Sequence, residues 1–352
     1  VSQPSLLSSF KPSYLPRGSS LQHHLGPLMK TNYLPYGKDI LNPEWPEATW
    51  DVGTLFVHDD NIINFYDTIK KRFGFPLSIK SVFGCYNVMW SGGRSSFGVA
   101  PTVHTGGWTP EVIIKEYNKR GIDVTYTFSN PLLKEKHLTD PSSNYLLDLL
   151  AKQKYEGNAV TITCDVLSDY IRKMYPNLKQ KASIVKSTME MPRRRTFEYY
   201  DNLFEKYDLV YLHPDDNFNL KLLKKIAASG KVGSYTLLIN ENCARNCTIR
   251  NSHYEEQSKP VIDGWHGMFS FTDVDQIHSP EHPNSICERH TKPQMKSCTL
   301  SHSEFKEIYD LGFRRFKLQG RDSPWTNMLF DLAFWSVEQD AMAYKISHYP
   351  HL

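Results

Sequence analysis

The sequence lacks a long hydrophobic run, since none of its 352 residues lie in a stretch of the ~18 consecutive apolar residues that a membrane helix needs. It also lacks an N-terminal basic stretch followed by an apolar one, so it predicts no secretory signal as it stands. Neither sign of charge dominates, because 41 basic residues face 38 acidic ones, which argues against wholesale wrapping by nucleic acid. We expect a cytoplasmic protein without a membrane partner, whose six cysteines are reduced thiols or metal ligands.

Several familiar motifs are missing as well. Neither GxGxxG nor GxxxxGK[ST] follows the first predicted strand, which argues against an open nucleotide-binding sheet. The CxxxCxxC triplet of radical-SAM enzymes is absent, and so is any internal repeat beyond the alternation of strands and helices. The only dense basic cluster is Arg193-Arg194-Arg195, which we expect to form a solvated loop, with contact to an anionic ligand as the alternative.

Apolar residues make up 40% of the chain, which is enough to fill a sizeable core. Residues 1–50 are rich in Pro, Ser, Tyr and His and have no periodic pattern, so they are expected to form an extended or partly disordered arm. Residues 51–352 are expected to form one domain, in which 241–300 is a cysteine-containing, loop-rich segment.

Short β-branched runs alternate with amphipathic stretches through this domain. The predicted strands are 79–86, 123–129, 159–164, 182–187, 209–213, 234–240, 267–271 and 315–319. The predicted helices are 110–120, 144–153, 167–174, 197–206, 220–228, 303–311 and 326–342. Eight strands, most of them too apolar to alternate, predict an α/β fold, a (β/α)8 TIM-type barrel of parallel strands.

In such barrels the chemistry lies at the carboxyl ends of the strands. The candidates for catalysis at these ends, through proton transfer or by holding an anionic group, are Asp165, Lys186, Glu190, His213 and Arg321. The candidates for substrate binding are Asn87, Arg94, Asn240, Glu241 and Gln319. This polar rim suits a small polar molecule or an extruded base.

Plainer interpretations stand beside these. Lys186 and Glu190 could form an ordinary ion pair, and His213, which precedes a proline, could be an ordinary loop residue. Cys85 and Cys164 lie on apolar strands, where a lone cysteine is usually a small core residue.

The most specific signal is a set of four cysteines, Cys243, Cys247, Cys287 and Cys298. The first two are four residues apart, so on a helical turn they would share one face. Four thiols from a loop-rich region suit either tetrahedral zinc or a cubane iron–sulfur cluster. The wide spacing of the last two is unlike a zinc knuckle, but nearby histidines could replace them as zinc ligands: His253, His266, His278, His282 and His290. Spacing therefore leaves both metals open, and disulfides or unrelated thiols are the plainer alternative.

Two stretches also resemble a known family. LLINENCARNCTIRNSHYEE at 237–256 looks like the cysteine segment of the collagenase-like peptidase superfamily, and FRRFKLQGRD at 313–322 is similar to that family's strand ending in Lys-x-x-Gly-Arg. Over roughly 79–340, the resemblance implies a barrel that carries a 4Fe-4S cluster on the four cysteines, with Lys317 and Arg321 in the site region. In the relatives the close cysteine pair follows a more distant cysteine, whereas here it comes first.

The resemblance implies oxygen-independent hydroxylation or a related redox or lyase step on a polar small molecule or nucleoside. A first alternative is a zinc-braced barrel that binds nucleic acid, such as RNA, or a protein partner, with Tyr14, Tyr33 and Tyr36 as stacking surfaces. A second is an aldolase-type barrel that uses Lys186 to form a Schiff base.

Overall fold

The computed structural model describes residues 44–73, 77–93, 108–263, 294–320 and 325–336. The chain divides into Val1–Asn42 and Pro43–Leu352, and every described residue belongs to the second unit. Within the described ranges no helix has the length and apolar character needed to cross a membrane.

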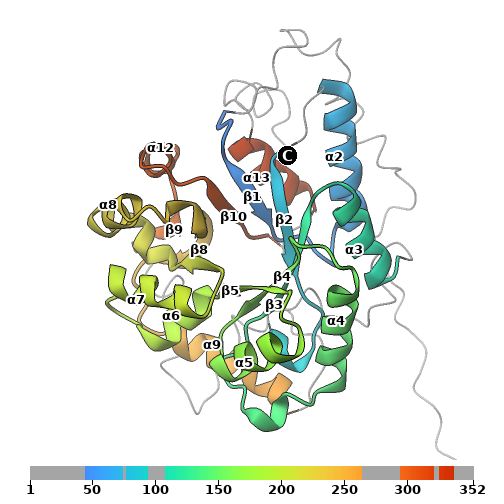
Figure 1. Ribbon diagram of the computed structural model, residues 1–352. Helices are drawn as coiled ribbons and strands as arrows, with labels where there is room; N and C mark the ends of the chain where they lie inside the picture. Colours follow the sequence, from blue (N-terminus) through green and yellow to red (C-terminus); the bar gives the residue numbers. More distant parts are fainter. Residues whose placement is uncertain (1–43, 74–76, 94–107, 264–293, 321–324, 337–352) are drawn as a thin grey trace, which may run out of the picture. The chain divides into compact units, whose positions relative to one another are not determined.

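Eight parallel strands form a closed barrel, which confirms the predicted fold class (Figure 1). The strands are β1 (Thr49–Val52), β2 (Ile79–Gly84), β3 (Asp123–Phe128), β4 (Ala159–Ile162), β5 (Lys179–Ala182), β6 (Leu209–Leu212), β7 (Tyr235–Leu238) and β10 (Arg315–Leu318). Their order around the barrel is β1-β10-β7-β6-β5-β4-β3-β2, and pairing of β1 with β2 closes it.

Helices follow the strands along the chain. They are α2 (Asp59–Phe73), α3 (Pro110–Lys119), α4 (Pro141–Lys152), α5 (Asp165–Met174), α6 (Ile184–Glu190), α7 (Phe197–Asn202), α8 (Leu220–Ala228), α9 (Arg250–Ile262), α12 (His302–Asp310) and α13 (Trp325–Ser336). Short 3-10 helices are η3 (Met89–Ser91), η4 (Glu135–His137), η5 (Leu203–Glu205), η6 (Pro214–Phe218) and η7 (Val232–Ser234). Capping sets several starts: the Thr109 and Asp140 side chains accept backbone N–H groups in the first turns of α3 and α4.

The interior of the barrel holds a buried ion pair. The Lys181 Nζ lies 3.6 Å from Asp51 Oδ2, and both side chains are almost fully buried. Ser81 and Tyr211 donate hydrogen bonds of 2.7 and 2.8 Å to the Asp51 carboxylate, and Lys181 donates one of 3.0 Å to Thr125. Burial opposes ionisation of Asp51, but the charge of Lys181 and these hydrogen bonds keep its pKa below the usual value.

A small antiparallel sheet continues from β7 and does not belong to the barrel. It pairs β8 (Asn240–Ala244) with β9 (Ser297–Thr299), with Glu241 opposite Cys298. The register shifts between Glu241 and Ala244, and Cys243 lies in this irregular stretch. The Ile239 N–H donates to the Lys317 carbonyl of β10, and the Ile239 carbonyl accepts from the Leu300 N–H after β9. These two hydrogen bonds hold the small sheet beside the carboxyl ends of β7 and β10.

Helix α9 packs against the segment that follows β2. The Ser258 hydroxyl donates to the Gly92 carbonyl at 3.1 Å. Gly93 has φ 72°, and a Cβ built there would lie only 2.1 Å from the Gln257 carbonyl oxygen, so this close approach requires glycine.

Three sequence predictions of local structure are wrong. The expected strand 182–187 is a helix, because β5 ends at Ala182 and the Ser183 side chain caps α6 by accepting the Val185 N–H. Cys243 lies on a strand, not a helical turn, and α9 begins only at Arg250. The strand β1 was not expected, since Thr49 and Trp50 lay within the predicted arm. The expected strand 267–271 lies outside the described residues.

Candidate functional site

A cavity of about 110 Å³ opens among the carboxyl ends of the barrel strands, and we call it the mouth cavity. Its lining comes from β2, β3, β4, β7 and β10, from the start of α6, and from β8 and α9. Its polar lining includes Ser129, Ser183, Glu241, Tyr254, Lys317 and Gln319. This is the end of the barrel at which the sequence predicted chemistry.

Lys317 places a positive charge in the mouth cavity. The residue is 8% exposed, and its Nζ lies 3.8 Å from the centre of the Phe83 ring and 4.4 Å from that of Tyr211. Aromatic faces attract a cation, so these rings hold the ammonium in place. Tyr211 in turn donates to Asp51, which links Lys317 to the buried ion pair below.

Three predicted substrate-binding residues come together at one edge of this cavity. Gln319 N donates to Asn240 Oδ1, and Asn240 Nδ2 donates to the Gln319 carbonyl, both at 2.8 Å. Gln319 Nε2 also donates to Glu241 Oε1 at 3.2 Å, and the Cys243 N–H donates to the same oxygen at 2.9 Å. The Glu241 carboxylate is therefore oriented by two donors.

Asp165, Lys186 and Glu190 form a separate cluster between α5 and α6. Lys186 Nζ lies 2.8 Å from Asp165 Oδ1 and 2.6 Å from Glu190 Oε1, and its side chain is 3% exposed. Burial opposes the charge, but the two carboxylates raise the pKa of Lys186 above its usual value. An ammonium held in this way favours the ordinary ion pair and disfavours the Schiff-base role, and Lys186 lines neither cavity described here.

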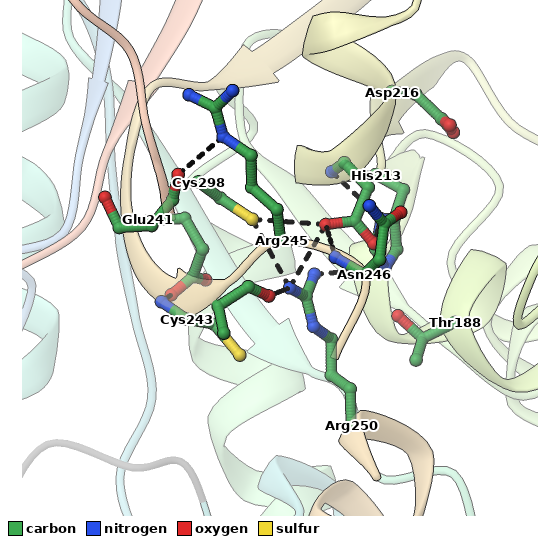
Figure 2. A network of polar contacts seen from close by, with 12 residues as sticks. Thr188, His213, Asp216, Glu241, Cys243, Arg245, Asn246, Arg250 and Cys298 are labelled. Atoms are coloured by element: carbon green, nitrogen blue, oxygen red, sulfur yellow. Dashed lines mark hydrogen bonds and ion pairs between the residues drawn. The ribbon is translucent and has the colours of Figure 1, made fainter. Parts of the chain in front are cut away.

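Beside the mouth, Arg250 joins the cysteine segment to the loop after β6 (Figure 2). Its Nη2 donates to the Ala244 carbonyl at 2.9 Å and lies 3.4 Å from both Cys298 Sγ and Asp215 Oδ1. Cys298 Sγ also donates to Asp215 Oδ1 at 3.2 Å. The first residue of α9 thus ties together β8, β9 and η6.

His213 is neutral in this network. Both ring nitrogens face donors: Nε2 lies 3.2 Å from Arg250 Nη1, and Nδ1 accepts from the Asp215 N–H at 3.2 Å. Nδ1 lies 3.5 Å from Asp215 Oδ2. Burial, with the charges of Arg250 and Arg195, lowers the pKa of His213 well below its usual value.

Cys243, Cys247 and Cys298 are the described members of the predicted four-cysteine set. The Cys247 thiol lies within hydrogen-bonding reach of Cys243. This contact and burial raise the pKa of the Cys243 thiol. Burial also raises the pKa of the Cys298 thiol. Among described residues no three His, Cys, Asp or Glu side chains are gathered to hold a metal ion. These residues therefore present a thiol pair and not a complete ligand set. Cys287 lies outside them, and the four-cysteine centre stays a prediction.

Arg250 also lines a second cavity, of about 280 Å³, which we call the arginine pocket. Arg193, Arg195, Arg250 and His213 contribute to its lining. Arg195 is buried and its Nε donates to Asp216 at 2.6 Å, so the prediction of a solvated arginine loop is wrong for this residue.

The remaining predicted residues lie apart from these cavities or outside the description. Asn87 is half-buried after β2 and lines neither cavity. Arg94 and Arg321 lie outside the described residues. Cys85 is buried, and Cys164 donates to the Asn130 carbonyl at 3.2 Å, in keeping with their plainer interpretation as structural residues.

Sequence reasoning missed Asp51, Lys181 and Arg250, and it named Arg195 only as part of the basic cluster. Arg250 stands in the quoted cysteine motif, and its place seven residues after Cys243 was a usable signal. Asp51 and Lys181 carried no signal, because charges on short strands look like charges on loops until the barrel closes around them.

The chain matches no family model and no curated protein. Among solved structures it is similar to that of the U32 peptidase Mk0906, with 13% sequence identity and a TM-score of 0.48, over 83% of this chain and 98% of that one.

Proposed function

We propose that the chain is a barrel enzyme that acts on a small polar molecule in the mouth cavity, and that Lys317 binds a negatively charged oxygen of that molecule. One observation carries the proposal: a cation held between two aromatic rings lines a cavity at the carboxyl ends of the strands.

The surroundings of Lys317 suit acid–base chemistry. A fixed cation in a site of low dielectric constant stabilises negative charge that develops on an oxygen, more strongly than it would in water. The Glu241 carboxylate is oriented by Gln319 and by the Cys243 N–H, and it lines the same cavity, where it can accept a proton. A proton transfer or lyase-type step on a molecule that carries a carbonyl or carboxylate fits this pair of groups.

Replacing Lys317 with Met should weaken ligand binding in the mouth cavity while leaving the fold intact. Thermal-shift titration of the full chain with a panel of 2-oxo acids, hydroxy acids and nucleosides should find members that stabilise the wild type. For those members we expect the affinity of Lys317→Met to be weaker by about ten- to a hundredfold, because a charged hydrogen bond is lost.

Lys115→Met is the matched control, since this lysine pairs with Glu111 on the exposed face of α3. It should leave the affinity for every member unchanged. The proposal fails if ligands bind Lys317→Met as tightly as the wild type, or if only uncharged molecules bind.

A metal centre on the cysteines is a second candidate, and the closeness of Cys243 and Cys247 favours it. With Cys298 and Cys287 they would supply four thiolates, and a bound iron–sulfur cluster would bring redox chemistry for a hydroxylation. No step of the acid–base chemistry above depends on such a group.

Metal analysis can decide this candidate. Anaerobically purified wild type should contain iron with sulfide, or zinc, and Cys243→Ser and Cys247→Ser should lose most of it, because each removes a ligand. Cys164→Ser is the control and should keep its metal, since Cys164 bonds the Asn130 carbonyl away from the pair. Equal metal and sulfide contents in all four proteins would exclude the ligand assignment.

A further inference from the structure

We propose that the arginine pocket binds a phosphate group. This site is separate from the mouth cavity, and the inference goes beyond the proposed function. Its volume of about 280 Å³ accommodates a phosphate group together with part of the molecule that carries it.

The charge of the pocket favours an anion. Arg193, Arg195 and Arg250 line it, and the nearby carboxylates are Asp215 and Asp216, which leaves one positive charge in excess. The neutral His213 adds no charge. Arginine forks match the geometry of phosphate oxygens, so three of them in one pocket favour a phosphate over a neutral ligand.

The start of α9 adds backbone donors to the same pocket. Residues Cys247, Thr248, Arg250 and Asn251 line it, and no side chain caps the first turn of this 13-residue helix. Uncapped N–H groups and the helix dipole attract anions.

An unused donor in the wall of the pocket points to a ligand independently. The Arg250 side chain is 3% exposed, and its buried Nε has no hydrogen-bond partner among the residues that the structure describes. An unpaired buried donor costs free energy, and an oxygen-rich anion in this pocket would reduce that cost by a small movement of the guanidinium.

The loop with the three arginines contains its own matched control. Arg193 lines the pocket, whereas its neighbour Arg194 does not, and both residues are exposed. Removing either changes the net charge of the protein equally, so only a specific site distinguishes the two variants.

Isothermal titration of the full chain with inorganic phosphate, at constant ionic strength in chloride, should show binding to the wild type. We expect Arg193→Ala to weaken it about tenfold and Arg194→Ala to leave it nearly unchanged. Arg250→Met should remove binding, but because Arg250 also ties β8 to η6, the exposed Arg193 is the decisive position.

A second titration with uridine 5′-monophosphate and uridine identifies the source of the phosphate. Tighter binding of the monophosphate than of inorganic phosphate, with no binding of uridine, indicates a phosphate ester. Tighter binding of inorganic phosphate than of the monophosphate indicates free phosphate. Lys317→Met should keep phosphate binding, which separates this inference from the proposed function. Equal effects of Arg193→Ala and Arg194→Ala, absence of phosphate binding, or its loss in Lys317→Met would each overturn the assignment.

Discussion

Lys181→Met should lower the free energy of unfolding by about 3–5 kcal/mol, because it removes the ion-pair partner of the Asp51 carboxylate, which stays buried in the barrel. The expected cost is this large because both side chains are nearly fully buried. Chemical denaturation monitored by circular dichroism measures it, provided that wild type and variant unfold in one cooperative transition.

The double variant Asp51→Asn with Lys181→Met tests whether the charge, and not the packing, is the cause. An asparagine at this position carries no charge. Its Oδ1 can accept from one of Ser81 and Tyr211, which donate to different oxygens of Asp51, and its Nδ2 can donate to the other hydroxyl, so we expect the double variant to be more stable than Lys181→Met alone. Lys115→Met, in an exposed pair on α3, should change stability by no more than about 0.5 kcal/mol. A double variant less stable than Lys181→Met would show that the unpaired charge of Asp51 does not cause the stability loss of the single variant.

The buried pair also has a consequence for the site above it. Tyr211 donates to Asp51, and its ring faces Lys317, so Tyr211 connects the charged interior layer to the cation that lines the mouth cavity. The buried Asp51–Lys181 pair and the aromatic contacts restrict movement of the Lys317 ammonium. Such fixed charges suit a site that is organised before its substrate binds.

The fold could be predicted where strands are apolar and helices have clear ends. The strands β3, β4 and β6 are buried along nearly their whole length and were expected within a few residues, and α8 was predicted at its observed bounds. The strands β1 and β5 were missed or displaced, because their polar residues point into a hydrophilic barrel layer. Composition along the chain does not reveal such a layer.

The candidate site could be predicted only in part, for a related reason. The rule that chemistry lies at strand ends selected Glu241 and Gln319, which line the mouth cavity, and His213, which lines the arginine pocket. It also selected Lys186, which forms an ion cluster instead. Arg250 and Arg195 come from a helix start and a loop, and only folding brings them together around Asp215.

Asp59, the first residue of α2, should make the stability of the protein depend on pH. Its carboxyl group is buried, accepting from the Phe56 N–H and the Tyr117 hydroxyl, both at 2.9 Å. Burial raises the pKa of Asp59 from 3.8 to about 7, although the two hydrogen bonds oppose the shift. The folded state therefore binds more protons than the unfolded state between these values.

The sign of the effect follows from this difference in protons. The stabilising contribution of protonated Asp59 is complete below about pH 4, and it is lost as the pH rises towards about 7. The total loss is roughly 4 kcal/mol at most, since one pKa unit corresponds to about 1.4 kcal/mol. Asp59→Asn keeps a neutral side chain at every pH, so its stability should lack this contribution to the slope.

The measurement is the difference in unfolding free energy between wild type and Asp59→Asn at several pH values from 4 to 8. The wild type should lose stability relative to Asp59→Asn as the pH rises, and the difference should become constant above about pH 7. Asp169→Asn is the control, because this aspartate is exposed, and its difference should stay small at every pH. A wild type that gains on Asp59→Asn with rising pH would mean that the two hydrogen bonds outweigh burial, and that Asp59 is ionised in the folded protein.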